Sequence, residues 1–236
     1  MKKISILVVC LTILVQAFAQ KTINDPNAEV REAKNFHGIS ISNAFDVYLT
    51  QGNEEAVAVS AIDSKYRDLI TVEVKNGILV IDIKKNGWKW MKGNKQLKAY
   101  ISFKAIDKLD ISGASDVYIQ GMIKADNLKI DMSGASNLRG KVESKKINID
   151  LSGASDMSLS GSTDDLTIDA SGASKFKGIE LTTDFCQAHA TGASDIKITV
   201  NKELSANASG ASDVKYKGTG VIRDIKSSGA SSISKI

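Results

Sequence analysis

The chain has 236 residues, of which 42% are hydrophobic and 25% are charged, so it is long and apolar enough to bury a sizeable core. Its formal charge of +4 falls to +2 if Lys2 and Lys3 are removed with a leader, which gives no reason to expect nucleic-acid binding. Of its two cysteines only Cys186 would remain in a mature chain, which excludes an intrachain disulfide and a cysteine-based zinc cluster there.

The N-terminus has the pattern of a secretory signal peptide. Lys2 and Lys3 precede an apolar run over residues 4–15, and Ala17-Phe18-Ala19 supplies the small residues that a signal peptidase reads. We therefore predict a signal peptide over residues 1–19. No later apolar run approaches the ~20 residues that a membrane-spanning helix needs. The expected location is the periplasm, the outer surface or the medium, with no integral membrane segment.

The next segments are polar and then strand-forming. Residues 20–35 contain the only proline, Pro26, and are predicted to form a polar leader or cap. Alternation predicts strands over residues 56–59, 71–74 and 78–83, with Asn76-Gly77 as a tight turn. We assign residues 36–104 to irregular coils of a single domain that spans residues 36–236.

A basic loop over residues 84–95 interrupts these irregular coils. No acidic residue occurs between Asp82 and Asp107, and both tryptophans of the chain lie in the loop. Exposed aromatic faces and clustered lysines suit an anionic glycan. The alternative is that the tryptophans pack on the solenoid and the lysines are only solvated. The candidate ligand-binding residues are Trp88, Trp90, Lys84, Lys85, Lys89 and Lys92.

From residue 105 onward the sequence is a regular repeat. The tetrapeptide (Ser/Thr)-Gly-Ala-Ser recurs at intervals of 21, 19, 19, 20, 18 and 19 residues, a period typical of a solenoid. Glycine permits a positive φ at a sharp bend, alanine fits where little volume remains, and we expect the stacked serines to hydrogen-bond to one another. The seven corner glycines are Gly113, Gly134, Gly153, Gly172, Gly192, Gly210 and Gly229.

Apolar residues alternate with polar ones on both sides of each tetrapeptide. The positions three and one residues before it, and five residues after its first residue, are mostly apolar, which predicts two strands per coil with one face buried. Cys186 falls in the column of Leu128, Ile147, Leu166 and Leu204 and is predicted to be a buried apolar residue. The predicted fold is all-β: a right-handed parallel β-helix (β-solenoid) with ~19-residue coils over residues 105–236.

The segment Phe45-Asp46-Val47-Tyr48-Leu49-Thr50-Gln51-Gly52 and the repeated Ser-Gly-Ala-Ser-Asp also carry a family resemblance. They resemble the family of putative auto-transporter adhesin, head GIN domain proteins from envelopes of Bacteroidetes-type bacteria. The resemblance covers nearly the whole mature chain. It implies an exported β-helical protein with an adhesive role, and it brings no catalytic residues or cofactor.

An acidic column is the second candidate site. Asp110, Asp131, Asp150 and Asp169 fall at the same position of successive coils, ~4.8 Å apart, and His189 takes that position in the next coil. Lys108 and Lys129 can screen the first two carboxylates. Three interpretations of Asp150, Asp169 and His189 stay open: a solvated strand face, a Ca²⁺ site on Asp150 and Asp169, or a glycoside-cleaving pair.

The sequence thus predicts a non-enzymatic cell-envelope or surface module, adhesin-like, that contacts a glycan or another envelope component and needs no cofactor. One alternative is a β-helical polysaccharide-degrading enzyme that uses Asp150, Asp169 and His189. Another is a purely structural envelope protein, because apolar side chains of the C-terminal coil, which ends at Ile236, would favour self-association.

Overall fold

The computed structural model describes residues 24–85, 87–90, 93 and 95–236, and for Trp88 and Trp90 it describes the backbone alone. The predicted signal peptide and Lys92 lie outside the described residues. In the described part of the chain there are two helices, α1 (Ser64–Arg67) and α2 (Gly87–Trp90), and neither is long and apolar enough to cross a membrane. The rest of the regular structure is strand: β1 (Glu29–Arg31), β2 (Gly38–Ile41), β3 (Asp46–Gln51), β4 (Ala56–Ser60), β5 (Ile70–Lys75), β6 (Ile78–Ile83), β7 (Lys98–Phe103), β8 (Lys108–Ile111), β9 (Asp116–Met132), β10 (Asn137–Leu151), β11 (Asp156–Ala170), β12 (Lys175–Ala190), β13 (Asp195–Ala208), β14 (Asp213–Lys217), β15 (Val221–Ser227) and β16 (Ser232–Lys235).

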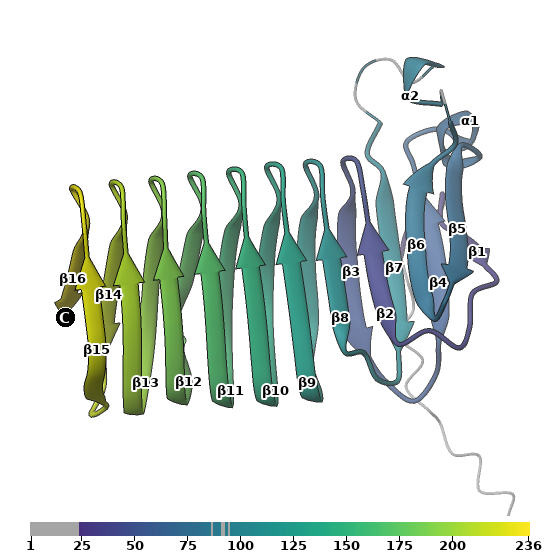
Figure 1. The fold of residues 1–236 in the computed structure, drawn as a ribbon. Helices are drawn as coiled ribbons and strands as arrows, with labels where there is room; N and C mark the ends of the chain where they lie inside the picture. The colour runs from purple at the N-terminus through teal and green to yellow at the C-terminus, as the bar shows by residue number, and fades with distance from the viewer. Residues whose placement is uncertain (1–23, 86, 91–92, 94) are drawn as a thin grey trace, which may run out of the picture.

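These strands form a β-solenoid, as the repeat predicts (Figure 1). Each of the long strands β9 to β13 bends at the lower corner, so its first half lies on the far face and its second half on the near face of Figure 1. The chain rises along the near face, turns over at the tetrapeptide and descends along the far face as the coils advance toward the C-terminus. This is a right-handed winding, the hand that parallel strand crossovers favour.

Both faces continue into the N-terminal part, where the strand pairing changes from parallel to antiparallel. On the near face, β8, β2 and β6 pair in parallel, and β5 then pairs with β6 in antiparallel fashion through the Asn76-Gly77 turn. Both turn residues have a positive φ, which confirms the predicted tight turn. On the far face, β7 pairs antiparallel with β4, and β4 with β1, which lies inside the predicted polar leader. Short antiparallel strands thus close this end of the parallel stack.

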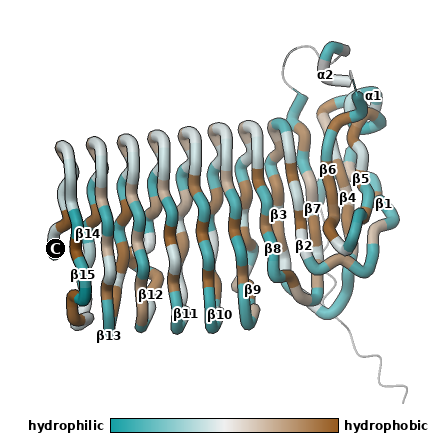
Figure 2. Tube along the Cα trace, viewed as in Figure 1, coloured by the Kyte–Doolittle hydropathy of each residue, from teal (hydrophilic) through white to brown (hydrophobic). Residues whose placement is uncertain are grey.

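The interior is a single column of apolar side chains. The alternation of apolar and polar residues along the strands appears as alternating brown and teal in Figure 2. The positions predicted to face inward are buried from Leu109 through Val214, and Cys186 is buried among them as predicted. The pattern weakens in the final coil, where Ile225 is 36% exposed. Because each coil alone encloses little apolar volume, its burial depends on the coils above and below.

The tetrapeptide corners stack through backbone hydrogen bonds. From the second tetrapeptide onward the corner alanine donates its N–H to the carbonyl of the equivalent glycine one coil earlier; Ala154 to Gly134 is 2.7 Å. Ala114, in the first tetrapeptide, donates to the Asn43 carbonyl at 2.6 Å. All seven corner glycines have a positive φ, between 70° and 85°. A Cβ on Gly153 would lie 2.4 Å from the carbonyl oxygen of Gly134. Glycine is therefore required both by the backbone conformation and by the closeness of the next coil.

The corner serines do not hydrogen-bond to one another, so that prediction is wrong. From the second tetrapeptide onward the last serine donates to the backbone carbonyl three residues earlier, as the buried Ser155 does to Ser152 at 2.9 Å. In three of the coils the first serine donates to a carbonyl of the preceding coil, as Ser171 does to Leu151 at 3.2 Å. Backbone carbonyls near the bend need donors of their own, and the hydroxyls supply them.

The corner stack yields a test of stability. We expect Gly153→Ala to lower the free energy of unfolding by at least about 2 kcal/mol, because it combines an unfavourable φ with a contact to the Gly134 carbonyl. Gly93→Ala is the matched control: Gly93 has the same φ of 70°, but nothing lies within 4 Å of its added Cβ. Denaturant unfolding monitored by circular dichroism measures both. An equal loss in the two variants would show that φ alone, and not coil contact, requires the glycine.

Candidate functional site

The basic loop stands at one end of the solenoid, above the near face in Figure 1, where α2 protrudes beside α1. Backbone hydrogen bonds fix its two ends: Lys84 N donates to Leu69 O at 2.8 Å, and Ile62 N donates to Lys95 O at 3.0 Å. The side chains of Lys84, Lys85 and Lys89 are exposed. Three of the predicted ligand-binding lysines thus project into solvent from a loop whose base is anchored to the body.

Three loop lysines have no carboxylate partner in the part of the chain that the structure describes, whereas the lysines of the regular coils divide into paired and unpaired ones. Lys145 lies 2.7 Å from Asp126 and Lys202 lies 2.7 Å from Asp184, but Lys141 makes no ion pair among the described residues. Within the described part of the chain, Lys84, Lys85 and Lys89 make no ion pair. Their positive charge is therefore available to an external anion.

The acidic column runs along the near face in the predicted register. The strand pairing places Asp110, Asp131, Asp150, Asp169 and His189 side by side in that order. Lys129 lies 2.8 Å from Asp131 and 3.4 Å from Asp150, so one lysine bridges two successive carboxylates. The repulsion between these carboxylates is therefore reduced within the face itself.

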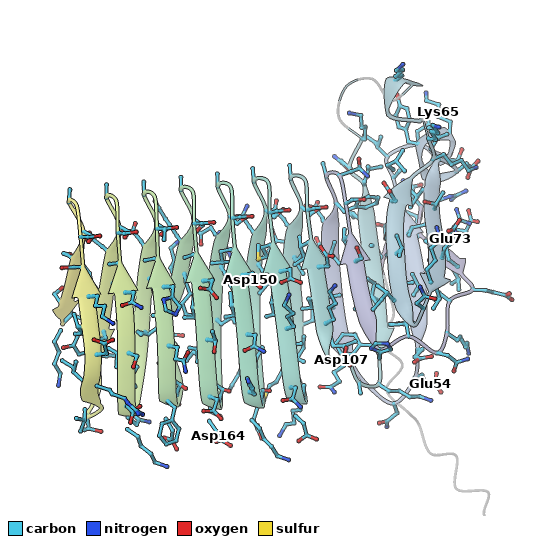
Figure 3. The ribbon with its side chains drawn as sticks, viewed as in Figure 1. Glu54, Lys65, Glu73, Asp107, Asp150 and Asp164 are labelled. Atoms are coloured by element: carbon cyan, nitrogen blue, oxygen red, sulfur yellow. The ribbon has the colours of Figure 1, made fainter. Side chains whose placement is uncertain are left out.

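A shallow hollow of about 310 Å³ lies over this column and is lined by Asp150, Asp169 and His189. Figure 3 shows Asp150 in the middle of the near face, pointing outward from an open strand. His189 Nδ1 lies 3.2 Å from Asn207 Nδ2, so the imidazole has a partner on the side away from the carboxylates. Among the described residues, no three His, Cys, Asp or Glu side chains converge as a metal site would require.

The far face carries a feature that the sequence interpretation missed. Tyr48 stacks on Tyr100 with ring centroids 5.2 Å apart, and on Tyr118 with centroids 5.5 Å apart. Tyr100 donates a hydrogen bond to Asp25 at 2.8 Å. Burial and, to a lesser extent, this bond raise the pKa of Tyr100, so the phenol stays uncharged near neutral pH. The three rings form a rigid tyrosine ladder across three rungs.

The ladder continues as a polar and basic column in the same register. After Tyr118 the column holds Arg139, Ser158, Lys177, Lys197 and Lys215 in successive coils. A depression of about 520 Å³ opens over part of this column, between Ile119 and Glu180. Aligning the repeats at the sixth position after the first tetrapeptide residue would have revealed the column. The depression itself depends on differences in coil length, which the residue types of a single column do not show.

Two further sequence predictions concern a thiol and the last coil. Burial raises the pKa of the Cys186 thiol to about 12, which agrees with an unreactive apolar role. In the final coil Val221, Ile222 and Ile236 are exposed. Self-association through this coil stays a prediction.

The acidic column gives a test of pH dependence. Burial and, to a lesser extent, a hydrogen bond with Asp131 raise the pKa of Asp150, so folding favours its protonated form. The free energy of unfolding therefore falls as the pH rises from the pKa of Asp150 in the unfolded chain through its higher pKa in the folded chain. We expect Asp150→Asn to raise the free energy of unfolding at pH ~7, by no more than about 0.5 kcal/mol for so exposed a group, and to leave it unchanged at pH ~3, as denaturant midpoints at the two pH values would show. A lower midpoint at neutral pH would mean that the Lys129 contact outweighs the burial.

Comparison with known proteins places this geometry in a family. The family described as "putative auto-transporter adhesin, head GIN domain" matches residues 35–220. A putative adhesin from Bacteroides fragilis has 24% identity and a TM-score of 0.83, with 89% of this chain and 96% of that chain covered. A putative adhesin from Parabacteroides distasonis has 17% identity and a TM-score of 0.68, with 89% and 96% covered. A "putative lipid binding protein" from the same organism has 21% identity and a TM-score of 0.67, with 90% and 98% covered. A search of curated proteins finds no match.

The structural likenesses show the shared fold, and the family match spans most of the sequence, so the chain belongs to the head GIN domain family.

Proposed function

We propose that the protein is an exported, non-enzymatic binding module of the cell envelope and that it contacts an anionic glycan through the basic loop over residues 84–95. The adhesin description of the family supports a binding role. The N-terminal pattern of two lysines, an apolar run and Ala17-Phe18-Ala19 supports export. The glycan and the loop are our own inference from charge and exposure.

The observation that carries the proposal is the group of exposed loop lysines without a counter-charge. Lys84, Lys85 and Lys89 lie on one short segment that stands clear of the solenoid body (Figure 1). Each would gain roughly 1 kcal/mol from a carboxylate or sulfate at about 4 Å, even at the dielectric constant of water. The nearby Trp88 and Trp90 add aromatic surface in the same sequence segment. Such binding should weaken as salt rises, because exposed charges are screened.

The enzyme alternative has weaker support. The hollow over Asp150, Asp169 and His189 is open, and a flat strand face does not enclose a substrate as active sites normally do. Lys129 is already engaged with Asp131 and Asp150, which ties one candidate carboxylate to the neighbouring coil. These features favour the interpretation of the near face as a solvated, self-neutralised surface.

The loop proposal is tested by cosedimentation of residues 20–236 with bacterial envelope polysaccharide at two salt concentrations. We expect Lys84→Ala/Lys85→Ala/Lys89→Ala to weaken binding at low salt by at least about tenfold, since three favourable charge contacts are lost. Trp88→Ala/Trp90→Ala should weaken binding at both salt concentrations, because stacking is not screened.

The control is Lys145→Ala/Lys202→Ala/Lys226→Ala, which removes the same charge from three lysines that already pair with Asp126, Asp184 and Asp224. It should bind nearly as the native chain does. Equal losses in the two triple variants would mean that only net charge matters and would contradict a binding site on the loop.

A further inference from the structure

The depression on the far face is a consequence of unequal coil length. The coils that begin at Gly134 and Gly153 have 19 residues, whereas the coil before them has 21 and the coil after them has 20. In the pairing of β9 with β10, the three residues 119–121 of β9 lie opposite Gly140 alone. In the pairing of β11 with β12, the two residues 178–179 of β12 lie opposite Leu159 alone. Between these two irregularities β10 and β11 pair without interruption. Two short coils are therefore recessed between two longer ones.

The recess has a polar floor and basic walls. Its volume is about 520 Å³, within the range of ligand pockets, and it is open to solvent. Ser158 and Ser160 supply hydroxyl groups to the lining, and the Ser160 hydroxyl donates to the Gly140 carbonyl at 3.4 Å. The Ile119 side chain occupies the space beside Gly140, where an added Cβ would lie 2.3 Å from it. Arg139, Lys141 and Lys177 line the walls, with Glu180 as the single acidic residue of the lining.

The cations of the recess are only partly neutralised. Lys177 lies 2.6 Å from Asp156. Arg139 and Lys141 are exposed and make no ion pair within the part of the chain that the structure describes. Arg139 can bind a carboxylate with two parallel hydrogen bonds, a geometry that suits a planar anion on a ligand. The recess thus combines an unpaired guanidinium with neighbouring hydroxyls.

The tyrosine ladder gives this site a rigid boundary. Tyr118, the last ring of the ladder, is 37% exposed and pairs in register with Arg139. Tyr48 stacks behind it, and the hydrogen bond from Tyr100 to Asp25 fixes the far end of the ladder. A boundary that is already ordered loses little conformational entropy when a ligand binds.

We propose that this recess binds a short acidic saccharide. Arg139 and Lys141 hold its carboxylate, and Ser158 and Ser160 hydrogen-bond to its hydroxyl groups. A single phosphate would use the cations but leave the hydroxyl-lined floor empty, and an apolar ligand would leave both unsatisfied. An oligomer of uronic acid carries a carboxylate and several hydroxyls on each ring, so it matches the whole lining. The site is separate from the basic loop, and the two proposals can fail independently.

The test is isothermal titration calorimetry of residues 20–236 with a galacturonate trimer and with its methyl ester, which keeps the hydroxyls and removes the charge. We expect the acid to bind and the ester to bind at least about tenfold more weakly, the value of one charge-assisted hydrogen bond. Arg139→Gln should weaken binding of the acid by a similar factor. Ser158→Tyr, which fills the recess from an outward-facing position, should abolish binding.

Lys215→Gln is the matched control, because Lys215 lies in the same column outside the recess. It should change affinity less than twofold. The loop variant Lys84→Ala/Lys85→Ala/Lys89→Ala should bind the trimer as the native chain does, even if it has lost envelope polysaccharide. The proposal is overturned if the acid and the ester bind alike, if Arg139→Gln and Lys215→Gln lose affinity equally, or if the native chain binds neither ligand.

Discussion

The backbone hydrogen bond from each corner alanine to the glycine carbonyl of the previous coil is the constraint on which the rest of the structure depends. At 2.7 to 2.8 Å from one regular coil to the next, it brings the chain so close to itself that no Cβ fits at the glycine position. Glycine must therefore recur at this position in the regular coils. Asn43 takes the same position at the start of the stack, with a positive φ that asparagine tolerates better than most residues.

Fixed corners place equivalent residues of successive coils side by side, so every outward position becomes a stripe along the solenoid. A stripe of like charges would repel, and on the near face Lys129 reduces this repulsion by lying between Asp131 and Asp150. We propose binding sites at two places where this balance is broken. The basic loop breaks it by leaving the stack, and the far-face recess breaks it through two coils that are shorter than their neighbours.

The parts of the fold that follow from periodicity could be predicted from the sequence. The repeat interval, the buried columns and the position of Cys186 depend on local alternation, which one sequence displays directly. The antiparallel pairing of β1 with β4 could not be predicted, because three residues carry no periodic signal. The serine hydroxyls were assigned the wrong partners, because the sequence does not show which backbone carbonyls lie near them.

The candidate sites also divide into those that could be predicted from the sequence and one that could not. The acidic column and the unpaired lysines of the loop were visible as composition and spacing. The recess needed two facts that lie far apart in the sequence, the register of Tyr118 with Arg139 and the extra residues of the flanking coils. To find such a site in a repeat protein, the lengths of successive coils must be compared together with the residues at each outward-facing position.

The most direct measurement is a titration of the ¹⁵N-labelled mature chain, residues 20–236, with the galacturonate trimer, followed by amide chemical shifts in NMR spectra. We predict that the largest shifts cluster at residues 139–141 and 158–160 and at Tyr118, with none along the column of Asp150 and Asp169. Shifts centred on Asp150, Asp169 and His189 would move the binding site to the near face. Shifts spread evenly over all lysines would contradict a built site and leave only diffuse charge attraction.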